Sequence, residues 1–289
     1  LPIFPYLLKD NCFGLIAISE ATLHIQMKLF KPDVAAKIRA KTLVMHPPQT
    51  LFTPQKSARH SDKIRLVFVG NEFYRKGGAE IVLALSELVE AGQIDASQLD
   101  VQLIGDLTKR HNVAHRKFQD DEAFYRNIQD RISRLSFVTH HAQMANSALL
   151  KLFQNSDLGL LPTWQETYGF SVLEMQASGC PVLTSNVRAL PEINPASAGW
   201  TIGGELNDDR EYQVNSEADK DRLRRALIDG IKSTLLDILA HPACLMEKGE
   251  GSILRIKQQH DPRQYGVRLN DIYRRGVVEC VEHPPALSI

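Results

Sequence analysis

The chain has 289 residues, 43% of them hydrophobic, which suffices for a large buried core and one or two domains. Its 34 basic and 34 acidic residues balance, so no net field favours nucleic acid, and nothing supports a peripheral membrane association. The four cysteines lack the spacing of metal ligands, and Cys12 and Cys180 are expected to be buried, reduced thiols of a cytoplasmic protein. Neither a signal peptide nor a transit peptide is visible, and because the chain begins at Leu1 rather than Met, we expect a piece of a longer protein.

Residues 1–52 are expected to form the end of an incomplete domain. A strand is predicted over 14–19, with Ser19 capping a helix over 20–30. One strand and two helices cannot close a domain by themselves. The segment MHPPQTLFTPQ (45–55) is rich in proline, which cannot continue a sheet, and is interpreted as a linker.

The middle of the chain alternates short apolar runs with helical patterns. Strands that are apolar throughout and separated by helices predict a parallel sheet that is covered on both faces. Residues 53–261 are therefore expected to form a doubly wound, Rossmann-like α/β domain. The expected strands span 65–70, 99–105, 136–140, 157–163, 181–185 and 198–203, and the expected helices span 78–92, 121–135, 146–156 (with an Asn or Ser cap) and 170–178.

Two further segments carry weaker patterns. The basic stretch KRHNVAHRK (109–117) is expected to be a solvated loop. After residue 216 the pattern is helical nearly to the end of the chain. Asp261 is expected to cap a last helix that begins at Pro262, within a terminal segment 262–289.

The stretch WQETYGFSVLE (164–174) places a loop, a glycine and a helix start between two glutamates. In an open parallel sheet, ligands bind at the carboxyl ends of the strands, where such loops converge. The amides of Gly169, Phe170 and Ser171 would present the positive end of a helix dipole to an anion such as a phosphate. Glu166 and Glu174 could then flank one ligand and accept hydrogen bonds from its hydroxyls. Alternatively, Glu166 is a plain loop residue and Glu174 a first-turn glutamate that the dipole favours.

A second candidate anion site lies in VGNEFYRKGGAE (69–80). Gly70 ends the first strand of the domain, and Arg75 and Lys76 come just before a helix that opens at Gly77-Gly78. Two cations beside a helix N-terminus suit a diphosphate, although an exposed basic turn is the alternative. Neither GxGxxG nor GxxxxGK[ST] is present. Together, the two loops fit a ligand with central phosphates and hydroxyls on both sides, as in a nucleotide sugar.

These residues resemble the donor-binding domain of retaining GT-B glycosyltransferases, most closely glycosyltransferase family 4. The stretch ETYGFSVLEMQASGCPV (166–182) is similar to the family's signature of two glutamates separated by seven residues and followed by Gly-x-Pro-Val. Tyr168 stands where Phe is usual, and Met175 where Ala is usual. The stretches LVFVGNEFYRKGG, VQLIGD and ALPEI are similar in the same order, and the resemblance covers residues 14 to 275, roughly.

The resemblance implies a role for each candidate residue. Glu166 would meet the hydroxyls of the donor sugar and Glu174 the ribose, while Arg75 and Lys76 would bind the diphosphate and stabilise it as it leaves. Many members carry an Arg directly after the first-strand glycine, where this chain has Asn71, and Arg75 is expected to substitute. His140 and His141 would line the nucleotide pocket or else be ordinary polar loop residues. The expected catalytic residues are Glu166, Lys76 and Arg75, and the expected donor-binding residues are Gly70, Gly105, His140, Thr167, Tyr168, Gly169, Phe170, Ser171 and Glu174.

The resemblance also implies a reaction. A hexosyl group would move from a UDP- or GDP-sugar to an acceptor with retention of configuration, with no metal or other cofactor. The acceptor would attack from the same face as the leaving phosphate, and electrostatic stabilisation of the diphosphate would lower the barrier. Since the acceptor site belongs to the N-terminal domain in this family, the chain would hold the donor half. A nucleotide-sugar epimerase and a non-catalytic nucleotide-sugar-binding module of the same fold are the alternatives, and the base, sugar and acceptor stay open.

Overall fold

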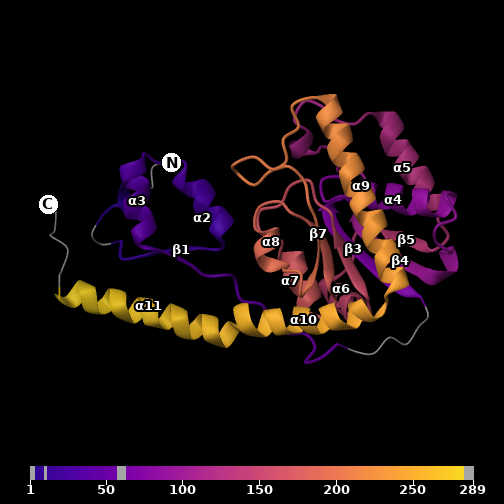
Figure 1. Cartoon of the computed structure of the whole chain (residues 1–289). Coiled ribbons are helices and arrows are strands. Elements are labelled where there is room, and N and C mark those ends of the chain that lie inside the picture. The colour runs from indigo at the N-terminus through magenta and orange to yellow at the C-terminus, as the bar shows by residue number, and fades with distance from the viewer. Residues whose placement is uncertain (1–3, 10–11, 57–62, 283–289) are drawn as a thin grey trace. The chain divides into compact units, whose positions relative to one another are not determined.

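The structure is a computed structural model that describes residues 4–9, 12–56 and 63–282 (Figure 1). The chain divides into two compact units. The smaller unit combines Leu1–Thr50 with Gln258–Ile289, and the larger unit is Leu51–Lys257.

The larger unit is built on a six-stranded sheet in which every neighbouring pair of strands is parallel. The strand order is β5-β4-β3-β6-β7-β8, so the chain adds strands first on one side of β3 and then on the other. This is the order of a doubly wound dinucleotide-binding fold, and the direction of winding reverses between β3 and β6. The predicted fold class is confirmed. The strands are β3 (Ile64–Glu72), β4 (Leu99–Asp106), β5 (Val138–His141), β6 (Leu158–Leu161), β7 (Val182–Ser185) and β8 (Gly199–Ile202).

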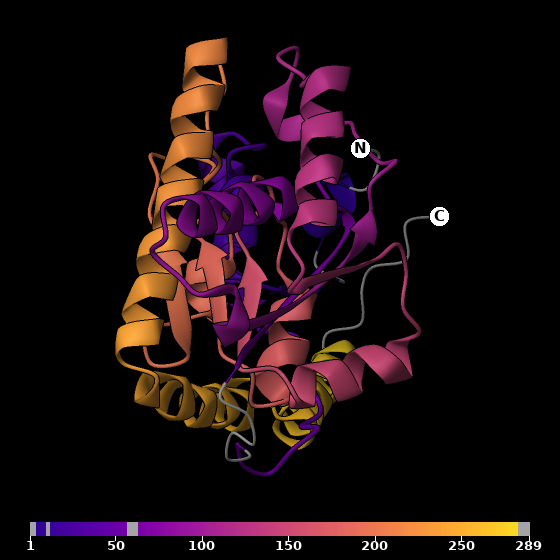
Figure 2. The same cartoon turned by 90° about the vertical axis from the view of Figure 1, so that its right-hand side faces the viewer.

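Helices cover both faces of this sheet, as the apolar strands require. In Figure 1, α4 and α5 lie on one side of the strands, and α7 and α8 on the other. Figure 2 shows α4 between α9 and α5. The side chains of Leu66, Phe68, Leu158 and Leu160 at the centre of the sheet are fully buried. The helices are α4 (Gly78–Glu90), α5 (Glu122–Arg134), α6 (Asn146–Gln154), α7 (Phe170–Ala177), α8 (Leu190–Ile193), α9 (Glu217–Ala240) and α10 (Ala243–Gln259), with short 3-10 turns at η1 (Ala96–Gln98) and η2 (Val113–His115).

Local capping accounts for several helix starts. Asp121 accepts a hydrogen bond from the amide of Phe124 at the start of α5, and Ser216 accepts one from the amide of Asp219 at the start of α9. The expected Asn or Ser cap of α6 is wrong, because Ala145 occupies that position and makes no side-chain cap.

The smaller unit contains a two-stranded parallel sheet of β1 (Leu15–Ala17) and β2 (Thr42–Val44). The strand β2 was not predicted, since three residues next to a proline-rich segment give little periodicity. Ser19 caps α2 as expected, with the amide of Thr22 donating to its hydroxyl over 3.0 Å. Asp261 accepts from the amide of Arg263 over 2.7 Å at the start of the last helix, also as expected. The helices of this unit are α1 (Phe4–Leu7), α2 (Glu20–Met27), α3 (Pro32–Ala40) and α11 (Pro262–Glu282).

Two expectations about the exposure of residues to solvent need correction. The stretch 109–117 is a loop with one short turn, but it is not wholly solvated, because Asn112 and His115 are buried. Cys180 is buried as expected, whereas Cys12 is partly exposed. Within the part of the chain that the structure describes, every helix is too short or too polar to cross a membrane.

Candidate functional site

Two loops meet where the sheet reverses its winding. The β3–α4 loop (73–77) and the β6–α7 loop (162–169) follow neighbouring strands at their carboxyl ends. The carbonyl of Arg75 accepts hydrogen bonds from the amide of Trp164 over 3.0 Å and from the hydroxyl of Thr163 over 3.1 Å. In an open α/β sheet, this reversal point is where ligands bind. The two stretches singled out in the sequence therefore form one site region.

Glycine is required at the junction of each loop with its helix. Gly77 precedes α4 with φ of 88°, and Gly169 precedes α7 with φ of 101°. A Cβ on Gly77 would clash with the carbonyl oxygen of Pro162, and one on Gly169 would lie 2.7 Å from a methyl group of Leu190. Both helices therefore begin abruptly. At the start of α4 the amide of Gly78 donates to the carbonyl of Phe73 over 2.9 Å, whereas at the start of α7 the amides of Phe170 and Ser171 have no partner among the described residues and could face an anion.

The Lys76 ammonium and the Glu166 carboxylate join the two loops directly. Nζ of Lys76 lies 2.5 Å from Oε2 of Glu166, and the two side chains are 16% and 13% exposed. The other oxygen of Glu166 accepts from the amide of Thr167 over 2.9 Å. Partial burial weakens solvent screening, so this pair is stronger than one on an open surface. The structure thus brings together the predicted cation and the predicted acid.

Arg75 lies beside this pair and is held by two partners. Its guanidinium forms an ion pair with Glu72 at the end of β3, and Nη1 donates to the carbonyl of Gln165 over 2.9 Å. The hydrogen bond from Arg75 lowers the pKa of Glu72. The Arg75 side chain therefore links β3 to the β6–α7 loop. Contact of Arg75 with a diphosphate remains a prediction.

Glu174 lies just over one turn inside α7 and is half-buried. Burial raises the pKa of its carboxyl. Among the described residues, no hydrogen bond or ion pair is found for this side chain, so its oxygens are available to a hydroxyl donor.

The other predicted residues between Glu166 and Glu174 differ in how far they are exposed to solvent. Tyr168 is buried, so its backbone rather than its ring could face a ligand. Phe170 begins α7 with 57% of its surface exposed, and its ring lies 5.2 Å from that of Tyr168. Thr167 is exposed and Ser171 is half-buried.

The remaining predicted residues lie at the ends of β3, β4 and β5. Gly70 and Gly105 lie side by side near the ends of β3 and β4, and a Cβ on Gly105 would clash with the carbonyl of Gly70. His140 and His141 are the last two residues of β5 rather than loop residues after it. A ring nitrogen of His140 lies 2.8 Å from the carbonyl oxygen of Gly105, which places His140 at the same edge of the sheet.

Sequence reasoning missed a set of buried polar residues behind the two loops. Trp164 and Glu80 are each 1% exposed, and Arg224 from α9 bonds to Glu80 across 144 positions of the chain. A glutamate in the first turn of an apolar helix was the only available signal, and it gave no hint of a partner so distant in sequence. These residues are His115, Asp120, Lys220, Arg224, Glu80 and Trp164.

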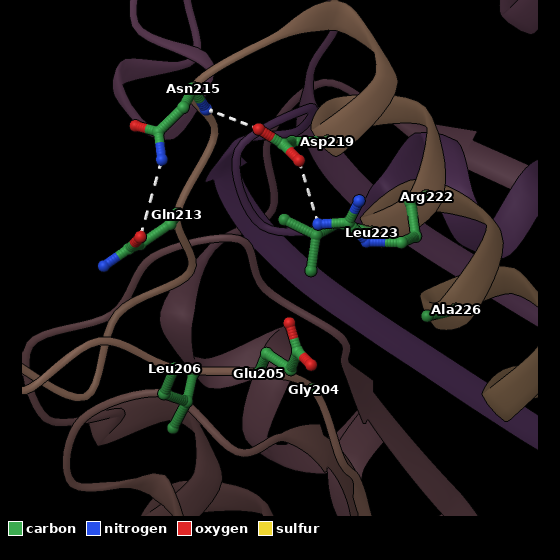
Figure 3. A pocket seen from close by; sticks show the side chains of 9 residues that line it. All are labelled: Gly204, Glu205, Leu206, Gln213, Asn215, Asp219, Arg222, Leu223 and Ala226. Atoms are coloured by element: carbon green, nitrogen blue, oxygen red, sulfur yellow. Dashed lines mark hydrogen bonds and ion pairs between the residues drawn. The ribbon is translucent and has the colours of Figure 1, made fainter.

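A separate pocket of about 550 Å³ lies between the segment after β8 and the first turns of α9 (Figure 3). Two charged side chains of its wall are paired, since Arg222 bonds Asp219 over 2.9 Å and Asp219 accepts from the amide of Asn215 over 3.1 Å. None of the residues that line it was predicted as a site residue. They are Gly204, Glu205, Leu206, Gln213, Asn215, Asp219, Arg222, Leu223 and Ala226.

Comparison with known families identifies the segment that carries the site. Residues 63–212 match the family described as glycosyl transferases group 1. This stretch covers more than half of the chain and includes both loops and the sheet up to β8.

Individual relatives agree with this match. A glycosyltransferase of Methanocaldococcus jannaschii, MJ1607, is 27% identical over 192 residues, which are 61% of this chain and 45% of that protein. The chain thus spans less than half the length of that relative. A glycosyltransferase from Rickettsia africae is 14% identical with a TM-score of 0.64, over 96% of this chain and 67% of that one. Anabaena HepE, solved with UDP and glucose, is 14% identical with a TM-score of 0.58, over 90% of this chain and 63% of that one. At such low identity, the two structures establish a shared GT-B fold.

Proposed function

The chain belongs to the family of glycosyl transferases group 1, and on that premise we propose that it is the donor-binding part of a retaining glycosyltransferase of family 4. The donor would be a nucleotide sugar, and the product a glycoside of an acceptor whose nature stays open. Two facts support the nucleotide-sugar donor. Anabaena HepE has the same fold and was solved with UDP and glucose, and the loops of this chain offer both a cation and amides to a diphosphate.

We assign the donor's parts to the two loops. The diphosphate would lie against Lys76 and the amides that open α4 and α7, with Arg75 nearby. The sugar hydroxyls would bond Glu166. The ribose hydroxyls would bond Glu174, whose carboxylate is half-buried and available. The end of the sheet at Gly70, Gly105 and His140 would receive the nucleoside.

The proposed chemistry is substitution at the anomeric carbon. The bond between this carbon and the diphosphate oxygen breaks, and the acceptor oxygen bonds to the same face of the sugar. The acceptor proton passes to the departing phosphate, so no side-chain nucleophile is needed. Negative charge grows on the diphosphate as the bond breaks, and Lys76 with the two helix N-termini would stabilise it. Transfer without a metal is part of this proposal.

A single observation carries the proposal: the Lys76–Glu166 contact at the point where the sheet reverses. This contact supports the proposal because it brings a cation suited to a phosphate and a carboxylate suited to hydroxyls together at the edge where open α/β sheets bind ligands.

Calorimetric titration of the chain with UDP, GDP and their sugar conjugates tests donor binding. We expect at least one nucleotide to bind, Lys76→Ala to weaken that binding about tenfold or more, and Lys151→Ala on the exposed face of α6 to leave it unchanged. Binding of none of these compounds, or equal binding by both variants, would contradict the proposal. The anomeric configuration of any glycoside formed, read by NMR, tests retention, and an epimerase would form no glycoside.

A further inference from the structure

A cluster of four charged side chains lies buried directly behind the two loops. It has two acids and two bases, and three chain segments contribute to it. Glu80 comes from the first turn of α4, Asp120 from the segment before α5, and Lys220 and Arg224 from α9. We call these residues the charged cluster. None of them has a part in the proposed reaction.

Arg224 is the centre of the charged cluster. Its Nε lies 3.2 Å from Oε1 of Glu80, and its Nη2 lies 2.7 Å from Oδ2 of Asp120. Lys220 lies 3.2 Å from the other oxygen of Asp120 and donates to the carbonyl of Phe118 over 2.9 Å. Burial disfavours the charged guanidinium, but Glu80 and Asp120 outweigh that effect and raise the pKa of Arg224. Lys220 also forms an ion pair with the exposed Glu217 over 2.7 Å, so both bases of the cluster are paired with acids.

Trp164 is packed against this cluster. The guanidinium of Arg224 lies 5.8 Å from the centre of the indole ring, and the ring of His115 meets the indole edge to face at 4.3 Å. Burial raises the pKa of Glu80, and Arg224 opposes that rise. The indole Nε1 of Trp164 is buried and has no hydrogen-bond partner among the described residues. Trp164 stands two positions before Glu166, and Glu80 stands four positions after Lys76.

The histidine beside Trp164 is neutral. Burial lowers the pKa of His115 to about 3, with Asp120 opposing the shift. The amide nitrogen of Asn112 lies 3.0 Å from Nε2 of His115 and can only donate, so Nε2 accepts and the proton sits on Nδ1, which faces Asp120 at 3.6 Å. The Trp164 ring thus has one cation and one uncharged ring among its neighbours.

Arg224 therefore lies beside both the β6–α7 loop, through Trp164, and the first turn of α4, through Glu80. Burying charges is unfavourable unless the geometry is good, and an apolar core of equal volume would often stabilise a fold as well. Such a cluster does, however, impose one arrangement on the segments that it joins. We propose that Arg224 is a positioning residue: by holding Trp164 and Glu80 together, it fixes Glu166 and the start of α4 around the donor's diphosphate.

This inference rests on the proposed function for its ligand, and its test uses UDP and GDP as probes. The two tryptophans of the chain are Trp164 and Trp200, so a Trp200→Phe background leaves Trp164 as the single tryptophan, which is excited selectively at a wavelength that tyrosine does not absorb. Three variants are compared in that background, at a temperature where circular dichroism shows all of them folded. Arg224→Met removes the charge. Arg224→Lys keeps the charge but loses the planar guanidinium that bonds two acids at once, and Arg225→Met is the control.

Arg225 is a matched control because it is the next residue of α9 and also bonds an acid of α4. Its guanidinium holds Glu87 through two hydrogen bonds of 2.8 Å, but its side chain is half-exposed. A loss that came from general loosening of α9 against α4 would appear in Arg225→Met as well.

Two readouts are measured on each variant: quenching of Trp164 by acrylamide without ligand, and the affinity for UDP and GDP. We expect Arg224→Met to increase quenching and weaken nucleotide affinity about tenfold to a hundredfold, Arg224→Lys to fall between, and Arg225→Met to match the parent. Equal behaviour of Arg224→Met and Arg225→Met would overturn the inference, as would a change in one readout without the other. If the parent binds neither UDP nor GDP, both the proposed function and this inference are refuted. If the parent binds a nucleotide and Arg224→Met binds it equally well, only the inference is refuted.

Discussion

The Lys76 ammonium lies 2.5 Å from the Glu166 carboxylate and joins the loops that follow β3 and β6. Without a ligand, each group therefore neutralises the other. A diphosphate and a sugar hydroxyl would have to replace this contact with two new ones, Lys76 to phosphate and Glu166 to hydroxyl. The pair thus holds both side chains in place in the absence of a ligand.

Replacing Glu166 should separate the binding of the nucleotide from the binding of the sugar. We expect Glu166→Gln to bind UDP or GDP about fivefold more tightly, because Lys76 no longer has a competing anion. The same variant should lose most of the additional affinity that the sugar of the full donor provides, and it should not transfer the sugar. Calorimetry with the diphosphate and with the full donor distinguishes the two effects. Glu247→Gln, which removes a charge from an exposed site on α10, should change neither affinity, and a loss of UDP and GDP affinity in Glu166→Gln would contradict this account.

The contact between Gly77 and Pro162 can be tested against backbone strain alone. Gly77 and Gly92 both have positive φ, at 88° and 63°, but a Cβ on Gly92 would meet no atom within 4 Å. We expect Gly92→Ala to lower the free energy of unfolding by about 1 kcal/mol, the ordinary penalty of a left-handed conformation. Gly77→Ala should lower it by more than twice that amount, because it also displaces the Pro162 carbonyl. Urea unfolding measures both, and equal losses would show that the loops can separate without penalty.

His115 should make the fold sensitive to mild acid. Burial lowers its pKa to about 3 in the folded chain, against 6.5 for an ordinary histidine. Below pH 6.5 the unfolded chain binds a proton that the folded chain does not, so the free energy of unfolding falls as pH falls towards 3. Between pH 7 and pH 5, this contribution amounts to about 2 kcal/mol. His115→Gln should remove it, as urea unfolding at the two pH values would show.

The control for that experiment lies in the same loop. His111 is exposed, and His111→Gln should retain the full difference between pH 7 and pH 5. A difference of the same size in His115→Gln as in the parent would show that other groups cause the loss of stability.

The cysteines should differ sharply in reactivity. Burial raises the pKa of the Cys180 thiol to about 12, so it carries almost no thiolate at pH 8 and has no access to solvent. We expect iodoacetamide to modify Cys12 and Cys244, which are partly exposed, and to leave Cys180 intact until the chain unfolds. Peptide mass spectrometry over time measures each site, and modification of Cys180 at the rate of Cys244 would contradict its burial.

Much of the larger unit could be predicted because its strands are apolar throughout. Runs such as RLVFVG and DLGLLPT fix both the element type and the parallel sheet, since a strand buried on both faces cannot alternate with polar residues. The two loops could be predicted for a similar reason: a glycine before a helix, next to cations or acids, is a local pattern. Their proximity followed from the general rule for carboxyl ends of parallel strands.

The remaining features depend on contacts between distant segments. Nothing near Arg224 in the sequence indicates that it bonds Glu80 and Asp120, and a basic loop gave no reason to expect His115 in the interior. The partners of Arg75 were equally hidden, because the sequence predicts a strand only to Gly70, whereas β3 extends to Glu72. Short strands such as β2 are set by their neighbour rather than by their own periodicity.

The close contact between Gly77 and Pro162 couples the substitutions that two loops can accept, although the loops lie far apart in the sequence. A bulkier residue in one loop would require a compensating backbone shift in the other, so we expect the two loops to change together during evolution. Anyone building a chimera to alter donor choice would need to graft both loops together, with their shared glycine and proline.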